Sequence, residues 1–395
     1  MTDEKTSVES ETTPPKRKGK RKFFLRLLLI VVVVAIIAWA LWYFLEGRWY
    51  VDTDDAYVGG NVVQITPKVP GTVVSIGADN GDLVHAGQVL VKLDPSDAEV
   101  ALEASKAGLA QAVRQVRGLY NNVEGAKAEV NARQVALDKA RSDYNRRKGL
   151  AESGAISAEM LAHAHDALAA AKSALITAKQ QYHNVEALVG GTKVASNPGV
   201  KAAEAKLRAA YLDDVRTTLI APVDGYVAKR TVQVGEMVRP GMALMAVVPL
   251  NQVWVDANFK ETQLEHMRIG QPVELTSDLY GGSVTYHGQV ESLGIGTGSA
   301  FSLLPAQNAT GNWIKIVQRV PVRISLEQKD LDKHPLRIGL SMSVTVNLHN
   351  QDGAMLAQTA PTKPVFTTDV YKKQLADANK LIHKIVQANL GHDDK

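Results

Sequence analysis

A stretch of 102 residues without proline, from Ser96 to Asn197, most constrains the fold of this chain of 395 residues, which holds 15 prolines in all. Because proline breaks the interior of a helix, its absence over this length favours long helices. Ser96 and Glu99 stand at capping-box spacing, which predicts a helix start. Beyond them, an apolar or aromatic residue returns every seventh position: Leu102, Leu109, Val116, Val123, Val130, Leu137 and Tyr144. This heptad repeat predicts a coiled coil.

A second repeat follows a polar turn that Gly149 and Gly154 bracket, with Ser157 as the N-cap of a returning helix. Its apolar positions keep an unbroken spacing of three and four residues: Leu161, Ala164, Leu168, Ala171, Leu175, Ala178, Tyr182 and Val185. We therefore expect an antiparallel α-helical hairpin over 96–216, with an interruption from Gly190 to Pro198. His163 and His165 lie on different faces of the returning helix, so no metal site is expected there.

Two segments outside this hairpin share the pattern G-x-V-x7-G-[DE]-x-V-x2-G-x2-L at a constant offset of 154 residues. The glycines of the two copies are Gly71, Gly81 and Gly87, and Gly225, Gly235 and Gly241. The pattern of each copy predicts short strands, with glycines where turns require a positive φ. The two copies should fold on each other as one small β-sandwich. The first copy, with the segment that leads into it, covers 47–95, and the second covers 217–249.

This pattern resembles the two halves of a biotinyl or lipoyl-type domain. A cofactor carrier of that type needs an acceptor lysine on the tight turn between its halves. Here the junction, residues 94–216, holds 123 residues instead. The sequence therefore favours a split lipoyl-like scaffold from which the hairpin projects, without a bound cofactor.

The 19 residues from Leu27 to Leu45 contain no charge or strongly polar group, which is long enough to nearly span a bilayer as one helix. Basic residues precede it and aromatic residues crowd its far end, so we expect a cytoplasmic tail over 1–22, a transmembrane helix over 23–46 and an exported remainder. A cleaved signal peptide is the alternative, because Ala38-Trp39-Ala40 resembles a cleavage site.

The segment 250–350 predicts a small antiparallel β-barrel. Apolar and polar residues alternate from Val253 to Lys260, and further strand-like runs cover 272–276, 284–293, 314–325 and 342–348. The remaining 351–395 form a tail with one short amphipathic helix, 365–389. The expected fold is thus α+β and membrane-anchored, with one N-terminal transmembrane helix, a split lipoyl-like β-sandwich, a long coiled-coil hairpin and a β-barrel.

Composition excludes several kinds of function. The chain has no cysteine, so disulfides, cysteine-metal sites and thiol catalysis are absent. A formal net charge of +4 is too small to indicate a nucleic-acid partner. No phosphate loop, metal spacing or nucleophile motif occurs, so neither an enzyme nor a cofactor is expected.

In the order of these parts the chain resembles the HlyD-type membrane fusion proteins, the periplasmic adaptors of tripartite pumps, and most closely their multidrug-efflux branch. Three strings carry the resemblance: Asp54 to Val58, Trp254 to Gln263, and Gly298 to Lys315. It implies an inner-membrane adaptor that forms an oligomeric ring and links a drug transporter, of the major-facilitator proton antiporter type, to a TolC-like outer-membrane channel. An adaptor of a type I protein-secretion system with an ABC exporter, or an anchored spacer without transport partners, would share the architecture.

The same resemblance extends to the hairpin tip. Arg146, Leu150 and Ser157 stand at the spacing R-x3-L-x6-S, which is similar to the tip signature of adaptors that meet TolC-like channels. A guanidinium can donate directional hydrogen bonds, an exposed leucine can enter a small groove, and a serine can cap the helix or present its hydroxyl. An ordinary turn is the alternative interpretation.

Overall fold

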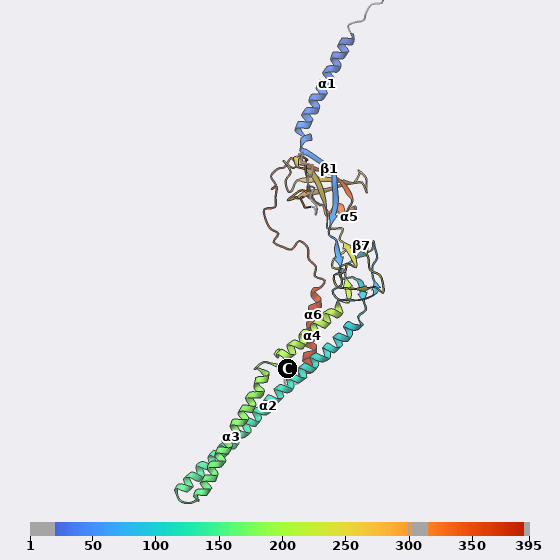
Figure 1. Ribbon diagram of the computed structural model, residues 1–395. Coiled ribbons are helices and arrows are strands. Elements are labelled where there is room, and N and C mark those ends of the chain that lie inside the picture. Colours follow the sequence, from blue (N-terminus) through green and yellow to red (C-terminus); the bar gives the residue numbers. More distant parts are fainter. Residues whose placement is uncertain (1–19, 299, 302–314, 391–395) are drawn as a thin grey trace, which may run out of the picture. The chain divides into compact units, whose positions relative to one another are not determined.

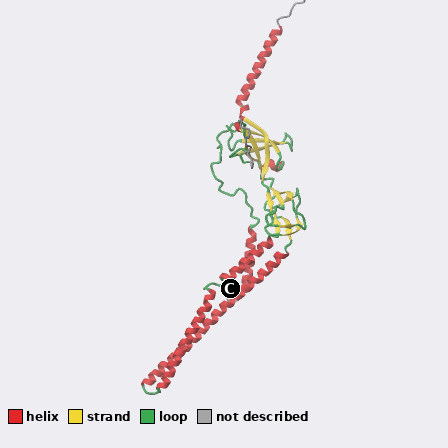
Figure 2. Cartoon of the chain, in the orientation of Figure 1, coloured by secondary structure: helices red, strands yellow, loops and turns green. Residues whose placement is uncertain are grey.

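A computed structural model describes residues 20–298, 300–301 and 315–390. The chain forms two units, each described by itself below (Figures 1 and 2). One unit comprises residues up to Asn61 together with Leu250–Lys363, and the other comprises Val62–Pro249 together with the segment from Pro364. Lys16, Arg17 and Lys18 of the basic cluster ahead of the apolar run lie outside the described residues, as does most of the string from Gly298 to Lys315.

The first unit begins with helix α1, Lys20–Leu45. Its apolar side chains are exposed all round, and by length and composition the helix is able to cross a membrane. A short 3-10 turn, Gly47–Trp49, leads into the first strand. Among the described residues α1 is the one helix long and apolar enough to cross a membrane, as the sequence predicts.

The rest of this unit is a closed antiparallel barrel of six strands in the order β1-β10-β13-β12-β11-β14. Its strands are β1 Tyr50–Gly60, β10 Val253–Lys260, β11 Pro272–Ser277, β12 Thr285–Leu293, β13 Arg319–Leu326 and β14 Ser341–Asn347. Phe259, Tyr286 and Ile324 fill its core, and Leu331 of a short helix α5, Gln328–Lys333, packs into the same cluster. The predicted barrel is confirmed.

One predicted boundary is wrong. The sequence interpretation placed 47–95 with the lipoyl-like half, but β1 closes the barrel between β10 and β14. Closure explains this, because without β1 both of those strands would expose an edge. The expected strand 314–325 begins later, at Arg319, and ends at Leu326.

The second unit contains the sandwich, made of two four-stranded sheets in the orders β2-β9-β7-β4 and β6-β5-β3-β8. The strands of the first copy are β2 Val63–Ile65, β3 Gly71–Ile76, β4 Leu83–Val84 and β5 Val89–Leu93. Those of the second copy are β6 Thr218–Ile220, β7 Gly225–Arg230, β8 Met237–Val238 and β9 Met245–Val248. Both sheets mix strands of the two copies, which confirms the split sandwich.

The two copies exchange hydrogen bonds reciprocally. The Gly81 amide donates to the Val227 carbonyl at 2.8 Å, and the Gly235 amide donates to the Val73 carbonyl at 2.8 Å. Val73 and Val227 are both buried, as the repeat predicts for its apolar positions. Because each copy supplies bonding partners for the other, neither half completes its sheets alone.

The repeated glycines fall into two kinds. Gly81, Gly87, Gly235 and Gly241 have φ between 85° and 92°, as expected for turns. For Gly71 and Gly225 the expected positive φ is wrong, because both lie at the start of a strand. A Cβ atom at Gly225 would lie 2.6 Å from the Val248 carbonyl oxygen, so close approach of two backbones requires that glycine.

The hairpin consists of α2 Ser96–Glu152, α3 Ala158–Val189 and α4 Pro198–Val215. The predicted capping box does not form at the start of α2. Instead the Asp94 carboxylate accepts hydrogen bonds from the Ser96 amide and hydroxyl, at 3.0 and 2.6 Å, and these bonds lower the pKa of Asp94. The returning arm is interrupted as predicted: Gly190 ends α3 with φ 56°, and Asn197 caps α4 ahead of Pro198.

The C-terminal segment adds a third helix to the base of the hairpin. Helix α6, Lys372–Asn389, inserts Ile382 and Val386 into a cluster with Leu109, Val113 and Leu207 of α2 and α4. Arg114 donates to Asn389 at 2.8 Å, and Arg208 donates to Asn379 at 3.0 Å. The predicted helix thus begins seven residues later than its expected start at 365, and it packs on the hairpin base.

This packing predicts that Ile382→Ala destabilises the base of the hairpin by about 2 to 5 kcal/mol, because the substitution leaves a cavity at a side chain that is only 5% exposed. Hydrogen exchange of the α2 and α4 amides near Leu109 and Leu207 should become faster. Leu375→Ala, at an exposed position of the same helix, should leave exchange unchanged. Equal exchange in both variants would contradict a stabilising role of α6.

Candidate functional site: the hairpin tip

The turn between α2 and α3 is short and closed by its own backbone. Helix α2 continues through Gly149, so the predicted bracketing of the turn by that glycine is wrong. Gly154 has φ 71°, and the Leu150 carbonyl accepts from the Ala155 amide at 3.0 Å and from the Ser153 hydroxyl at 2.8 Å. These bonds hold the end of α2 and leave side chains at the turn free to face outward.

Ser157 is the N-cap of α3. Its hydroxyl oxygen accepts from the Met160 amide at 3.2 Å, which satisfies one of the free amides at the helix start. The residue is exposed, so its hydroxyl hydrogen remains available to an acceptor outside the chain. Ser157 therefore caps α3 as predicted, and its hydroxyl can at the same time donate to an outside partner.

Arg146 pairs with Asp143, one turn earlier on the same helix, and its side chain is 72% exposed. Asp143 also forms an ion pair with Arg147, with 3.0 Å between its Oδ2 and the arginine Nε. One carboxylate therefore orients two guanidinium groups and offsets one of their two charges. The sequence interpretation did not single out Asp143, although its spacing of three and four residues from the arginines is a recognisable signal.

Leu150 completes the set, and it is 43% exposed at the end of α2. The fold brings Arg146, Leu150 and Ser157 to the same end of the hairpin, but within the described part of the chain no hydrogen bond joins their side chains. Such an arrangement can present a cation, an apolar side chain and a hydroxyl to a partner.

Between the two arms, close to the tip, the Tyr144 and His165 rings meet edge to face with centroids 5.8 Å apart. Sequence reasoning weighed His165 only as a metal ligand. Among the described residues no group of three histidine or acidic side chains is placed to hold a metal ion. The contact instead joins α2 to α3 where the alanine-rich seam offers little apolar surface.

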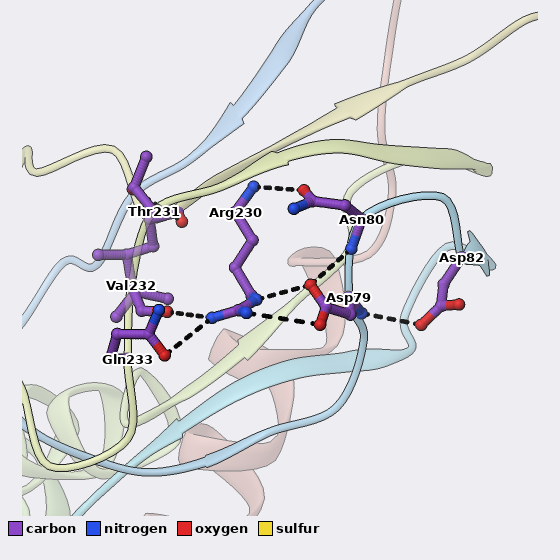
Figure 3. A network of polar contacts seen from close by, with 8 residues as sticks. Asp79, Asn80, Asp82, Arg230, Thr231, Val232 and Gln233 are labelled. Carbon is purple, nitrogen blue, oxygen red and sulfur yellow. Dashed lines mark hydrogen bonds and ion pairs between the residues drawn. The ribbon is translucent and has the colours of Figure 1, made fainter.

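The scaffold that carries the hairpin has a polar network joining the two copies (Figure 3). Arg230 of β7 binds Asp79 of the first copy, with 2.8 Å between Nε and Oδ1, and also donates to the Val232 carbonyl at 2.7 Å. The Asn80 side chain accepts from the Arg230 amide at 2.7 Å. The hydrogen bond from Arg230 holds the pKa of Asp79 below its ordinary value and raises the pKa of Arg230. The equivalent positions of the opposite copies are Gln233 and Ile76, so this network has no symmetric counterpart.

Two family models match parts of this chain. Residues 96–217 match the model of the EMRA alpha-helical hairpin domain, and residues 252–348 match the AAEA-like beta-barrel domain. A solved structure of the periplasmic adaptor protein EmrA, 22% identical, covers 76% of this chain and 99% of its own, with a TM-score of 0.38.

Two relatives are much more similar in sequence. The fatty acid resistance protein FarA of Neisseria gonorrhoeae is 52% identical over 309 residues, which are 78% of each chain. The multidrug export protein EmrA of Escherichia coli (strain K12) is 50% identical over 355 residues, which are 90% of this chain and 91% of that protein. On these two matches, this chain belongs to the EmrA family of membrane fusion adaptors.

Proposed function

We propose that this chain is the periplasmic adaptor of a tripartite multidrug efflux pump. The observation that carries the proposal is the 50% identity to a multidrug export protein over nine-tenths of both chains, which includes the hairpin and the barrel. The adaptor links an inner-membrane drug transporter, of the major-facilitator proton antiporter type, to a TolC-like channel in the outer membrane. It is not an enzyme, and the transporter supplies the energy for export.

The parts of the chain have matching roles in this proposal. Helix α1 anchors the adaptor in the inner membrane with the N-terminus in the cytoplasm, the barrel and sandwich lie in the periplasm, and the hairpin tip docks to the channel. Several copies form a ring, because a sealed conduit needs a closed set of adaptors.

The orientation gives a direct prediction. Alkaline phosphatase joined after Asp55 should be active, because the enzyme folds only when it is exported and Asp55 follows α1 by ten residues. A fusion within the first 20 residues should be inactive and serves as the control. An inactive fusion after Asp55 would contradict the proposed adaptor.

The partners are tested by co-purification from solubilised membranes. Retention of a major-facilitator antiporter supports the pump. Retention of an ABC exporter instead would support the protein-secretion alternative, and retention of neither would support an anchored spacer.

A further inference from the structure

The two ends of the barrel differ in how much apolar surface they expose. At the end where α1 joins, β1 and β11 begin and β10 ends, so the loops after Lys260, Leu293 and Asn347 all lie at this end. Within the barrel unit, which ends at Lys363, the exposed large apolar residues described in these loops are Ile295, Phe301, Ile316, Val317, Met355 and Leu356. Of these, Ile295 is 92% exposed and Leu356 is 60% exposed. We name these six residues the apolar rim.

The opposite end of the barrel has little comparable surface. Its loops, 278–284 and 327–340, expose Leu279 and Ile338 among the described large apolar residues. A soluble protein domain exposes scattered apolar side chains everywhere, but a cluster confined to one end marks a surface that binds something. The difference in exposed apolar surface between the two barrel ends therefore indicates that a partner covers the α1 end.

The segments that carry the apolar rim are tied to the barrel. The buried side chain of Gln271 donates to the carbonyls of His266 and Asn350, at 2.9 and 2.7 Å. The Ile269 amide donates to the Ala354 carbonyl at 3.0 Å, directly before Met355. On the other side, the Glu261 amide donates to the Gln318 carbonyl at 2.9 Å, directly after Ile316 and Val317. The rim is thus presented from a fixed frame.

The same end is joined closely to α1. Only residues 46–49 separate the helix from β1, so the barrel end stands less than about 20 Å from the end of the helix. Its place is fixed further by contacts: the Leu348 amide donates to the Trp49 carbonyl at 2.8 Å, and His349 lies 3.6 Å from Glu46. The Trp49 ring stands between His266 and His349, with centroids 5.9 and 5.7 Å away. Tryptophan and tyrosine at such a position favour the headgroup layer of a bilayer.

We infer that the apolar rim rests in the interfacial layer of the membrane that α1 spans, so that lipid covers this end of the barrel. The tether leaves the rim within reach of the headgroups and acyl boundary, and apolar side chains gain free energy there. The segments at this end carry charges of both signs, which suits zwitterionic and anionic headgroups together: Glu46, Arg48, Lys260, Glu261, Glu265, Arg268 and Lys315. The adaptor then has two membrane contacts, the helix and the barrel rim. This inference rests on α1 spanning the bilayer, as the proposed function requires.

Fluorophores attached to single cysteines test the inference, because the chain contains no cysteine of its own. The full chain would be placed, without a transporter, in nanodiscs of phosphatidylethanolamine and phosphatidylglycerol. Ile316→Cys and Leu356→Cys probe the rim, Leu279→Cys probes the opposite end, and Val33→Cys probes α1. Quenching by lipids with a nitroxide near the headgroup should be several-fold stronger at the two rim positions than at Leu279→Cys.

The four positions separate the possible failures. Quenching at Val33→Cys by deeper nitroxides, with rim labels that respond no more than Leu279→Cys, would overturn the inference and leave the anchor intact. Absence of quenching at Val33→Cys would overturn both the anchor and the inference. Rim labels that become shielded only when a transporter is added would show that a protein, and not lipid, covers the rim.

Discussion

Replacing Leu150 with aspartate should abolish channel association and reduce drug resistance to the level of cells that lack the adaptor. Leu150 is 43% exposed at the end of α2 and lies outside the buried core, so the hairpin should stay folded after the substitution. A carboxylate at this position would have to be desolvated in any groove that accepts a leucine, which costs more than the apolar contact gains. Channel association is measured by cross-linking in membranes, and resistance by growth in drug.

Controls distinguish docking from structure. Val135→Asp introduces the same charge at an exposed apolar position of α2 away from the tip, and it should leave resistance unchanged. Joint replacement of Arg146 by alanine and Ser157 by aspartate should behave like Leu150→Asp, because aspartate keeps a capping oxygen while the guanidinium and hydroxyl are lost. Protein level, helix content and transporter binding should stay normal in all variants. Full resistance in Leu150→Asp and in the double variant would make the tip a plain turn.

The second large effect is expected in the scaffold, where Gly225→Val should strongly destabilise the sandwich. A Cβ at Gly225 would lie 2.6 Å from the Val248 carbonyl oxygen and 2.8 Å from its carbon, and these backbone atoms belong to the neighbouring strand β9. A clash with backbone cannot be relieved by a side-chain rotation, so we expect a loss of about 3 kcal/mol in the free energy of unfolding. Denaturant unfolding followed by circular dichroism would measure it.

Gly71 is the matched control, because it occupies the equivalent position of the first copy. A Cβ there would meet only side-chain atoms of Leu93, at 3.2 Å and beyond. Gly71→Ala should therefore be tolerated, whereas Gly225→Ala should not. Gly81→Val and Gly235→Val should each cost about 1 to 3 kcal/mol through backbone strain, since both glycines have positive φ. Normal folding of Gly81→Val, Gly235→Val and Gly225→Val together would contradict the split-sandwich interpretation.

The hairpin and the sandwich were predictable because their signals are periodic or repeated. Heptad spacing directly indicates which side of a helix is buried. The offset of 154 residues identifies two copies, and the structure places their buried valines and turn glycines alike. The tip residues could be named because their spacing resembles the tip signature of related adaptors. Asp143, which pairs with Arg146, was not singled out, although its spacing from the arginines is a recognisable signal.

Long-range pairing was not predictable in the same way. Nothing local in Tyr50–Gly60 says that this strand pairs with Val253–Lys260 and not with the strands that follow it. The requirement at Gly225 is similar, because it depends on the approach of Val248, which is distant in the sequence. The docking of α6 also depends on a cluster assembled from three segments, and an amphipathic pattern does not name its partner surface.

The two arms of the hairpin leave the sandwich from adjacent strands. Helix α2 follows β5 and α4 precedes β6, and these strands pair in one sheet, with Val89 opposite Ile220 and Lys92 opposite Thr218. The coiled coil is thus the loop of a β-ribbon, and its length is independent of the sheets below it. Seven residues added to each arm would keep the heptad register and move the tip outward by about 10 Å. An adaptor built this way can be matched to periplasms of different depth by changing helix length alone, without redesigning the domain that holds it.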